Sequence, residues 1–600
     1  MPRKRKANIE KENKVFVPSK YQTAIFDFIE HGHGNLVVEA ASGSGKTTTL
    51  LKGIGLIDKD KSIFLTAFNR DIMKTLAKKT NDMENVNVST MHSLGLRLLK
   101  SNFHDKKCEL DEYKYKSYIN TNINKLIASS MKESRLSRYK SNVMQLVDYG
   151  RLYLAQTVKD LDFVSDRYGI AVVDNEKDVA LDVMEWGKNH LDGIDYIDMI
   201  YLPNILNCKS YEKYDWICVD EAQDLSVAQR QILLKCCKIN TRMVFFGDSN
   251  QTIYSFAGSD PESFRTLKEM PNTTSLPLSI SYRCAKKIVK FAQQYVPSIE
   301  ENDDGRVGEI KRETELSDAQ DGDMILCRNN APLMLAYVKL IAMGKKCFIR
   351  GKDIGVNLKN MVLSTNKKEL NVDLSNDGVF VRLYDWYFDL IKGMVDKYGI
   401  SYSDAVNSST AMAMADQINA LAVLSNGLND ANELVEKIDT IFSDDKGLDG
   451  IALSTIHKAK GLEADRVHII CDSLMPSKQA TKDWEIVQEK NLMYVAYTRA
   501  KNVLSFVRED GFKDFMKNKV ESETAMKKIE VKVDTALRRE MRKYDTSNPE
   551  VAEEIIRHSS DIEKPKIEKI NKLTGGTNGI QMKTGYGSFA KRKTTKIRKI

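Results

Sequence analysis

One short stretch of the sequence has the residue types that bind the phosphates of a nucleotide. After an apolar run, the chain reads Glu39-Ala40-Ala41-Ser42-Gly43-Ser44-Gly45-Lys46-Thr47-Thr48. Glycines at positions 43 and 45 let backbone N–H groups turn toward phosphate oxygens. Lys46 can reach the terminal phosphates, and Thr47 can offer a hydroxyl to Mg²⁺ at the start of a helix. Although the strict pattern has Gly where Ala40 stands, the stretch predicts a nucleotide-binding P-loop.

A second stretch, Asp220-Glu221-Ala222-Gln223-Asp224, has the carboxylates that such a site needs. It follows an apolar run directly, so Asp220 would lie at the end of a strand, where it can bind the Mg²⁺ shell. Glu221 can polarise a water for in-line attack on the γ-phosphate. The five residues alone could equally be a solvated acidic turn. The apolar strand and the P-loop together favour the catalytic interpretation.

The strands that must position these residues occur in two separate blocks. Each is a short, continuous apolar run, which is typical of strands buried on both faces of a parallel sheet with helices between them. The first block comprises 35–38, 63–66, 216–219 and 243–246, and the second comprises 324–327, 451–454, 467–470 and 503–506. The sequence therefore predicts an α/β protein with two parallel-sheet cores.

Two stretches at helical spacing interrupt these cores. We predict core 1 over residues 1–100 and 211–275, with a helical insertion over 101–210. Core 2 is predicted over 276–356 and 446–510, with a helical insertion over 357–445. Residues 511–600 are strongly charged and then rich in Gly, Thr and Lys, which predicts a helix or two and a flexible basic tail.

The composition excludes several other classes of protein. The 600 residues are 42% hydrophobic and 29% charged, which is too apolar for a chain that is disordered throughout. The chain has no apolar stretch near the roughly 18 residues that cross a bilayer, and its N-terminus lacks a signal-peptide apolar region. We expect a soluble cytoplasmic protein, in the host cytoplasm if the source is viral, with no membrane partner. The 9 cysteines include no C-x-x-C pair, so they are expected to be reduced, mostly buried thiols.

Positive charge is concentrated at the two ends of the chain. Lys plus Arg outnumber Asp plus Glu by 91 to 83, for a net charge of +8, with basic clusters at residues 3–6 and 591–599. These clusters could be solvated disordered tails or arms that contact nucleic acid phosphates. Charge alone does not distinguish the two.

Further motifs follow in a definite order along the chain. They are Pro18-Ser19-Lys20-Tyr21-Gln22, Thr66-Ala67-Phe68-Asn69-Arg70, Ser89-Thr90-Met91-His92-Ser93, the run 247–256, Ser281-Tyr282-Arg283, the run 454–463 and the run 494–500. With Asp-Glu-Ala-Gln-Asp, this set resembles the UvrD/Rep-like branch of superfamily 1 helicases. The matches run from Gln22 to Arg499 and cover most of the chain.

The resemblance implies two RecA-like P-loop NTPase cores with ATP and Mg²⁺ in the cleft between them. The resemblance assigns catalysis to Glu221, Gln251, Arg283 and Arg499. It assigns metal binding to Thr47 and Asp220. The residues that it assigns to ATP binding are Gln22, Ala40, Ala41, Ser42, Gly43, Ser44, Gly45, Lys46, Thr47, Thr48, Tyr282 and Glu463. Gln22 would read the adenine edge while Tyr282 stacks on the ring, and Gln251 would stand at the γ-phosphate. Arg283 and Arg499, supplied by core 2, would stabilise charge that develops on the γ-phosphate.

The resemblance also implies contacts with one strand of DNA. The candidates are Phe68, Asn69, His92, Phe256, Thr455 and His457. Phe68 and Phe256 could instead be core aromatics, and for His92 and His457 a structural hydrogen bond is as good an interpretation as a DNA contact. Bases that stack on aromatic rings and are released in turn would let the protein step along the strand.

Three features depart from the family pattern. Ala257 stands where the family commonly has Arg, so one DNA or coupling contact differs. Residues 488–491 match only loosely the acidic and basic residues that usually precede the last motif in this family. Roughly 180 residues separate Arg283 from Glu463, so the second insertion, about 90 residues on ordinary domain sizes, is expected to be reduced.

The leading hypothesis is an ATP-dependent DNA helicase or translocase that acts at single strands and duplex junctions, with the 3′–5′ polarity of this branch. One alternative is a motor subunit that needs a nuclease or another partner to unwind. Another is an ATP-gated DNA-binding switch, and an RNA track is a weaker option. Replication, repair, recombination, viral and defence pathways all fit the sequence, so a replication or repair protein is also a possible partner.

Overall fold

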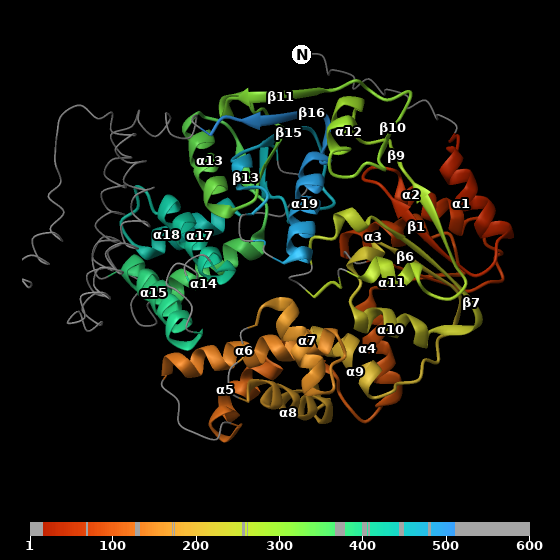
Figure 1. The fold of residues 1–600 in the computed structure, drawn as a ribbon, viewed down its shortest axis with the longest axis horizontal. Helices are drawn as coiled ribbons and strands as arrows, with labels where there is room; N and C mark the ends of the chain where they lie inside the picture. The colour runs from red at the N-terminus through yellow and green to blue at the C-terminus, as the bar shows by residue number, and fades with distance from the viewer. Residues whose placement is uncertain are drawn as a thin grey trace, which may run out of the picture.

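The framework of the protein is a pair of parallel sheets, one in each core (Figure 1). The computed structural model describes residues 16–67, 70–126, 133–170, 172, 175–254, 258–260, 262–365, 378–398, 405, 408–442, 449–477, 480 and 482–509. Every pair of neighbouring strands in the two six-stranded sheets is parallel. The prediction of an α/β fold with two parallel-sheet cores is confirmed.

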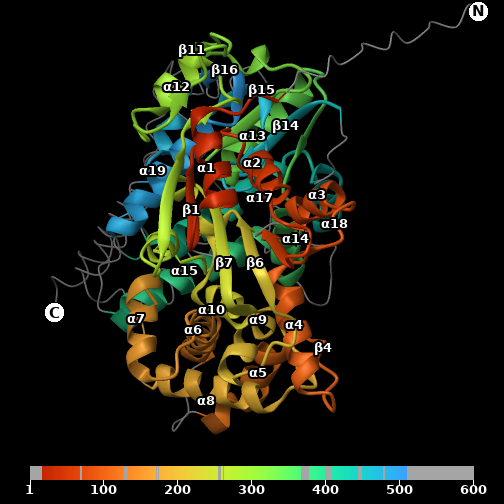
Figure 2. The same ribbon diagram turned by 90° about the vertical axis from the view of Figure 1, so that its right-hand side faces the viewer.

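Sheet 1 carries the P-loop and the acidic stretch. Its strand order is β3-β2-β6-β7-β1-β8, and the strands are β1 (Asn35–Ala40), β2 (Ile63–Ala67), β3 (Val86–Val88), β6 (Tyr214–Asp220), β7 (Cys237–Gly247) and β8 (Thr273–Leu278). The central strands are apolar on both faces because helices cover both sides. The helices around the sheet are α1 (Lys20–His31), α2 (Lys46–Ile54), α3 (Arg70–Lys79), α4 (Met91–Asn102), α10 (Val227–Lys235) and α11 (Ser263–Lys268). Figure 2 labels β1, β7 and β6, which are neighbouring strands of this sheet.

Sheet 2 carries the second set of motifs. Its order is β11-β16-β15-β12-β14-β13, and the strands are β11 (Glu309–Thr314), β12 (Met324–Cys327), β13 (Cys347–Ile349), β14 (Ile451–Thr455), β15 (Ala464–Ile469) and β16 (Ala500–Val507). Helices α12 (Lys286–Ala292), α13 (Asn330–Ala342) and α19 (Asp483–Tyr497) pack against it, and the short strands β9 (Ile280–Ser281) and β10 (Glu300–Glu301) form a separate pair. Ala41 and Ile253 of core 1 belong to the same buried cluster as one face of sheet 2, so the two cores are packed against each other.

A helical insertion packs against each core. The first comprises α5 (Lys114–Leu126), α6 (Glu133–Leu152), α7 (Val158–Tyr168), α8 (Glu176–Asn189) and α9 (Tyr196–Ile205), with the strand pair β4 (Glu109–Leu110) and β5 (Gly193–Ile194). The second comprises α14 (Lys352–Thr365), α15 (Val379–Tyr398), α17 (Ser409–Leu424) and α18 (Ala431–Ile441). Figure 1 shows them as the orange and the green-to-teal helices. They touch where Arg138 of α6 donates to the Gly393 carbonyl of α15 at 3.1 Å.

Some predicted limits of the domains differ from the limits of the elements. β8 extends to Leu278, beyond the predicted end of core 1 at residue 275, because its backbone pairs with β1 as far as Ala40 opposite Leu278. α14 begins at Lys352, before the predicted start of the second insertion at residue 357. The predicted segment 511–600 lies outside the described residues. Within the described part of the chain, no helix is long and apolar enough to cross a membrane.

Candidate functional site

The P-loop joins β1 to α2, and both of its glycines are needed for its shape. Gly43 and Gly45 have φ values of +73° and +83°, which lie in the left-handed region that favours glycine. Core 2 also comes very close, because a Cβ placed on Gly43 would lie 2.4 Å from the Cβ of Arg283. The backbone N–H of Tyr282 donates to the Gly43 carbonyl at 2.9 Å. Gly43 therefore allows both the turn and the approach of core 2.

The side chains around the loop fit a triphosphate with Mg²⁺. The hydroxyl of Ser44 is buried and has no hydrogen-bond partner among the described residues, so a phosphate oxygen could satisfy it. The Thr47 hydroxyl donates to Asp220 Oδ2 at 2.8 Å, and such oxygens are the ligands that Mg²⁺ prefers, with phosphates and waters completing the shell. The described residues contain no group of three or more His, Cys, Asp or Glu that could hold a metal. With the nucleotide bound, Thr47 and Asp220 would share the ion with its phosphates.

The acidic stretch follows β6 and lies beside the P-loop. Glu221 has φ +55°, a conformation that costs a non-glycine residue free energy and often marks a functional site. Its carboxylate pairs with Lys46 Nζ at 3.0 Å and accepts a hydrogen bond from Gln223 at 2.6 Å. Burial opposes the charge of Glu221, but Lys46 and Lys460 outweigh it and lower the pKa. Burial, with the charge of Glu221 nearby, raises the pKa of Asp220.

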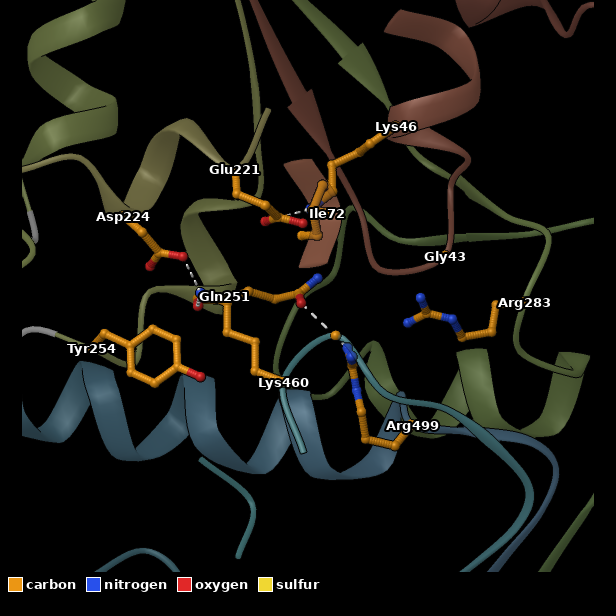
Figure 3. A pocket seen from close by; sticks show the side chains of 11 residues that line it. Gly43, Lys46, Ile72, Glu221, Asp224, Gln251, Tyr254, Arg283, Lys460 and Arg499 are labelled. Carbon is orange, nitrogen blue, oxygen red and sulfur yellow. Dashed lines mark hydrogen bonds and ion pairs between the residues drawn. The ribbon is translucent and has the colours of Figure 1, made fainter. Parts of the chain in front are cut away.

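Two arginines of core 2 reach the P-loop (Figure 3). Arg499 is 1% exposed, and its Nη2 donates to Ser42 Oγ and to Gln251 Oε1, each at 3.2 Å. Arg283 donates to the same Ser42 Oγ at 3.3 Å. Burial, together with the charge of Arg283, lowers the pKa of Arg499 to about 10, so the guanidinium is still charged at neutral pH. The structure thus brings together the predicted catalytic residues Gln251, Arg283 and Arg499, whose roles remain predictions.

The remaining predicted ATP-binding residues lie around this cluster. Ala40 ends β1, Ala41 donates its N–H to the Leu278 carbonyl at 2.9 Å, and Thr48 is exposed in the first turn of α2. Glu463 accepts from Arg283 at 2.6 Å and pairs with Lys501 at 2.7 Å. Its carboxylate therefore holds Arg283 in place in this structure.

The two predicted base-recognition residues lie on opposite cores. Gln22 is buried, and its amide nitrogen donates to Thr49 Oγ1 at 3.0 Å while its oxygen accepts from the Ser19 N–H at 3.0 Å. Ser19 also accepts from the Gln22 N–H, so the pair forms a capping box at the start of α1. Tyr282 directly follows β9, and 44% of its surface is exposed. An exposed ring is suited to stack on a base.

Lys460 is a member of the site to which the motifs had assigned no role. Its Nζ lies 2.5 Å from Asp224 Oδ2, donates to the Gln251 carbonyl at 2.7 Å and lies 4.8 Å from the centre of the Tyr254 ring. Asp224 is 1% exposed, and burial raises the pKa of its carboxyl. The only signal in the sequence was the position of Lys460 in the motif that ends at Glu463. Lys460 thus links core 2 to the acidic stretch of core 1.

We expect the substitution Lys460→Met to lower kcat for ATP hydrolysis by about 100-fold. Without Lys460, closing the cleft would bury the Asp224 carboxylate unpaired, which costs about 3–5 kcal/mol and depopulates the closed arrangement. Steady-state ATPase assays with saturating single-stranded DNA measure the loss, and adding Asp224→Asn should restore part of it. Lys458→Met is the matched control, because Lys458 makes an exposed pair with Asp353 and should change kcat less than twofold. A normal kcat in Lys460→Met would contradict this coupling.

The structure describes only some of the predicted DNA contacts. Phe68, Asn69 and Phe256 lie outside the described residues. His92 contacts Tyr196 edge-on, with ring centres 6.2 Å apart, and burial lowers its pKa. Burial lowers the pKa of His457 to about 3, with a further effect of Arg328, so His457 is neutral at physiological pH and would offer hydrogen bonds rather than a charge.

Thr455 and His457 lie next to the interface between the cores. Thr455 ends β14 and is 6% exposed, and its hydroxyl accepts from the Lys458 N–H at 3.4 Å. The Tyr254 hydroxyl of core 1 donates to the His457 carbonyl at 2.9 Å. A contact of either residue with DNA would therefore be close to the contacts that join the cores, but such a contact stays a prediction.

Two family models match the chain. The model described as UvrD/REP helicase N-terminal domain matches residues 22–272, and the model described as UvrD-like helicase C-terminal domain matches residues 381–511. The first spans the P-loop, the acidic stretch and the first helical insertion. The second begins within α15 and spans the motifs from β14 to Arg499.

Individual relatives match over much of the chain at low identity. The chain is 22% identical to ATP-dependent DNA helicase Rep of Buchnera aphidicola (subsp. Acyrthosiphon pisum), over 80% of this chain and 93% of the relative. It is 21% identical to DNA helicase II of Rickettsia typhi, over 81% of this chain and 91% of the relative. F-box DNA helicase protein 1 of Schizosaccharomyces pombe is 24% identical over 78% of this chain but only 55% of its own length.

Proposed function

Because the chain belongs to the UvrD/Rep-like branch of superfamily 1 helicases and is an ATP-hydrolysing DNA helicase, we propose that it binds single-stranded DNA and moves along it 3′ to 5′ to unwind duplex. The observation that carries the proposal is the contact of Arg283 and Arg499 of core 2 with Ser42 of the P-loop in core 1. Since both cores build one nucleotide site, binding and hydrolysis would change how the cores are held together.

Each step of hydrolysis would use one of the residues around the P-loop. Lys46 would exchange its pairing with Glu221 for the terminal phosphates, and the Ser44 hydroxyl with the turned N–H groups of the loop would bind phosphate oxygens. Mg²⁺, when bound through Thr47 and Asp220, would neutralise phosphate charge. Glu221 would orient and deprotonate the attacking water. Arg499, fixed by Gln251, would stabilise the charge that develops on the γ-phosphate.

The link to DNA would run through the contacts between the cores. Lys460 bonds the Gln251 carbonyl, and the Tyr254 hydroxyl bonds the His457 carbonyl, so the nucleotide site and the predicted DNA-contacting motifs share the same segments. A change in nucleotide state would move these segments relative to each other. Alternate gripping and release of the strand would then give net stepping.

Unwinding of tailed duplexes tests activity and polarity together. We expect duplexes with a 3′ single-stranded tail to be unwound with ATP and duplexes with a 5′ tail to remain intact. Preference for the 5′ tail would overturn the proposed polarity. ATP hydrolysis stimulated by single-stranded DNA without unwinding of either substrate would instead favour a motor subunit that needs a nuclease or another partner.

A further inference from the structure

A contact between the two cores lies on the side of the nucleotide site where α1 begins. The Tyr21 hydroxyl donates to Glu300 Oε1, and Lys20 Nζ lies 3.7 Å from Glu300 Oε2. Tyr21 is in the first turn of α1 in core 1, whereas Glu300 is on β10 in core 2. None of these residues touches the P-loop or the acidic stretch in the contacts described above.

Glu300 is held firmly by the backbone of core 2. β10 pairs in parallel with β9, with Glu300 opposite Ile280 and Glu301 opposite Ser281. The Glu300 N–H donates to the Ser279 carbonyl at 2.9 Å. The preceding residue, Ile299, is fully buried in the hydrophobic cluster of core 2. The position of Glu300 therefore follows the position of β9.

The Tyr21–Glu300 contact connects the two elements that carry the predicted base-recognition residues. On core 1, Tyr21 is adjacent to Gln22, whose amide is fixed by Ser19 and Thr49. On core 2, β9 leads directly into Tyr282, whose N–H is bonded to the Gly43 carbonyl at 2.9 Å. α1 also packs on β8, which a single residue separates from β9, so the Tyr21–Glu300 contact adds a side-chain link to the backbone path between α1 and β9.

We propose that Tyr21 and Glu300 form a brace that sets the spacing between Gln22 and Tyr282 and thereby determines the affinity for adenine nucleotides and the selectivity against other bases. Tyr21 and Glu300 are positioning residues: they act through Gln22 and Tyr282. The inference rests on the proposed ATP-dependent function in one respect, namely the prediction from the family resemblance that Gln22 and Tyr282 hold the base of the nucleotide. If the space for the base between Gln22 and Tyr282 already has the right width, nucleotide binding costs less free energy than if these residues must first be ordered.

The test measures equilibrium binding of ATP and GTP, and the steady-state kinetics of their hydrolysis, in Tyr21→Phe and Glu300→Gln. Both substitutions keep the shape of the side chain: Tyr21→Phe removes the donor of a charge-assisted hydrogen bond, and Glu300→Gln removes the charge of its acceptor. We expect the Kd and KM for ATP to rise about 5- to 10-fold, with the values for GTP nearly unchanged and kcat within about twofold of wild type. The double variant should be no worse than the stronger single variant, because both changes break the same contact.

Glu301→Gln is the matched control, since it makes the same chemical change at the neighbouring, exposed position of β10 and should leave both nucleotides unaffected. Wild-type Kd values for ATP in both brace variants would overturn the proposal. So would a fall in kcat at unchanged Kd, because it would place Tyr21 and Glu300 in catalysis rather than in base recognition. Failure of the proposed function would show separately, as a lack of unwinding by the wild-type protein, while nucleotide binding still reports on the brace.

Discussion

Replacing Arg499 by lysine should lower kcat for DNA-stimulated ATP hydrolysis by about 1,000-fold, since an arginine at the transferring phosphoryl group is worth about 10³–10⁵ in rate. The loss should be large even though the positive charge is kept. Arg499 donates through one guanidinium nitrogen to both Ser42 and Gln251 and through Nε to the Val495 carbonyl. A lysine has a single nitrogen at the end of a flexible chain and cannot keep this planar geometry.

The measurement is kcat at saturating ATP and single-stranded DNA, with the KM for ATP expected to change much less. Because Arg499 is buried, thermal unfolding must show that Arg499→Lys is folded. Arg508→Lys is the matched control, because Arg508 lies just beyond the other end of β16, is 52% exposed in its side chain and pairs with Glu313 at 3.9 Å and with Glu315 at 3.5 Å. A kcat within tenfold of wild type would show that Arg499 does not act on the γ-phosphate.

The second large effect is expected for Glu221→Gln, which should lower kcat by about 100- to 10,000-fold, the range for loss of a general base. The environment of Glu221 keeps its carboxylate ionised, because Lys46 and Lys460 lower its pKa against the effect of burial. Glutamine has the same shape and can still accept hydrogen bonds from Lys46 and Gln223, but it does not accept a proton from water at neutral pH. Nucleotide and DNA binding should therefore persist while hydrolysis stops.

Single-turnover hydrolysis, followed by unwinding assays, measures this effect and separates a motor from a switch. A motor with Glu221→Gln should bind DNA and stall, whereas an ATP-gated switch should keep its function. Glu212→Gln is the control, because Glu212 precedes β6 and pairs on the surface with Arg97; it should change kcat less than twofold. Continued strand separation by Glu221→Gln would remove Glu221 from catalysis and favour the switch.

Taken together, the substitutions test whether the ATP site is one unit built by both cores. Glu221 belongs to core 1, whereas Arg499 and Lys460 belong to core 2. If hydrolysis requires closure of the cleft, changes on either side should lower kcat far more than they raise KM. The brace substitutions at Tyr21 and Glu300 should show the opposite pattern, because they act on the base rather than on the γ-phosphate.

Local features of the site could be read from the sequence because they depend on neighbouring residues. The apolar runs predicted the strands, since continuous burial on both faces of a parallel sheet demands such runs. Gly43 and Gly45 predicted the P-loop turn, and both adopt positive φ values. The limits of the domains stay a prediction: the second insertion was predicted from residue 357, whereas its first helix, α14, begins at Lys352, because packing as well as local sequence decides where a helix begins.

Contacts between segments that are distant in the chain could not be predicted from the sequence in this way, because they do not depend on neighbouring residues. The resemblance assigned Glu463 to nucleotide binding, which stays a prediction, but gave no sign of its ion pairs with Arg283 and Lys501. The motifs assign no role to Lys460, and its contact with Asp224 arises only in the folded protein. The Tyr21–Glu300 contact joins residues on two different cores and has no counterpart in any single motif.

The sequence by itself determined the positions of the strands, the phosphate-binding loop, the acidic stretch and the helicase family. These follow from side-chain periodicity, from the backbone freedom of glycine and from residue types at short spacing, all of which are local properties of the chain. Only the tertiary structure decided which residues of core 1 these core 2 side chains contact: Arg283 and Arg499 contact Ser42 of the P-loop, and Lys460 contacts Asp224 of the acidic stretch. Those contacts depend on how two separately formed sheets pack against each other, because packing sets distances between residues that are hundreds of positions apart in the chain.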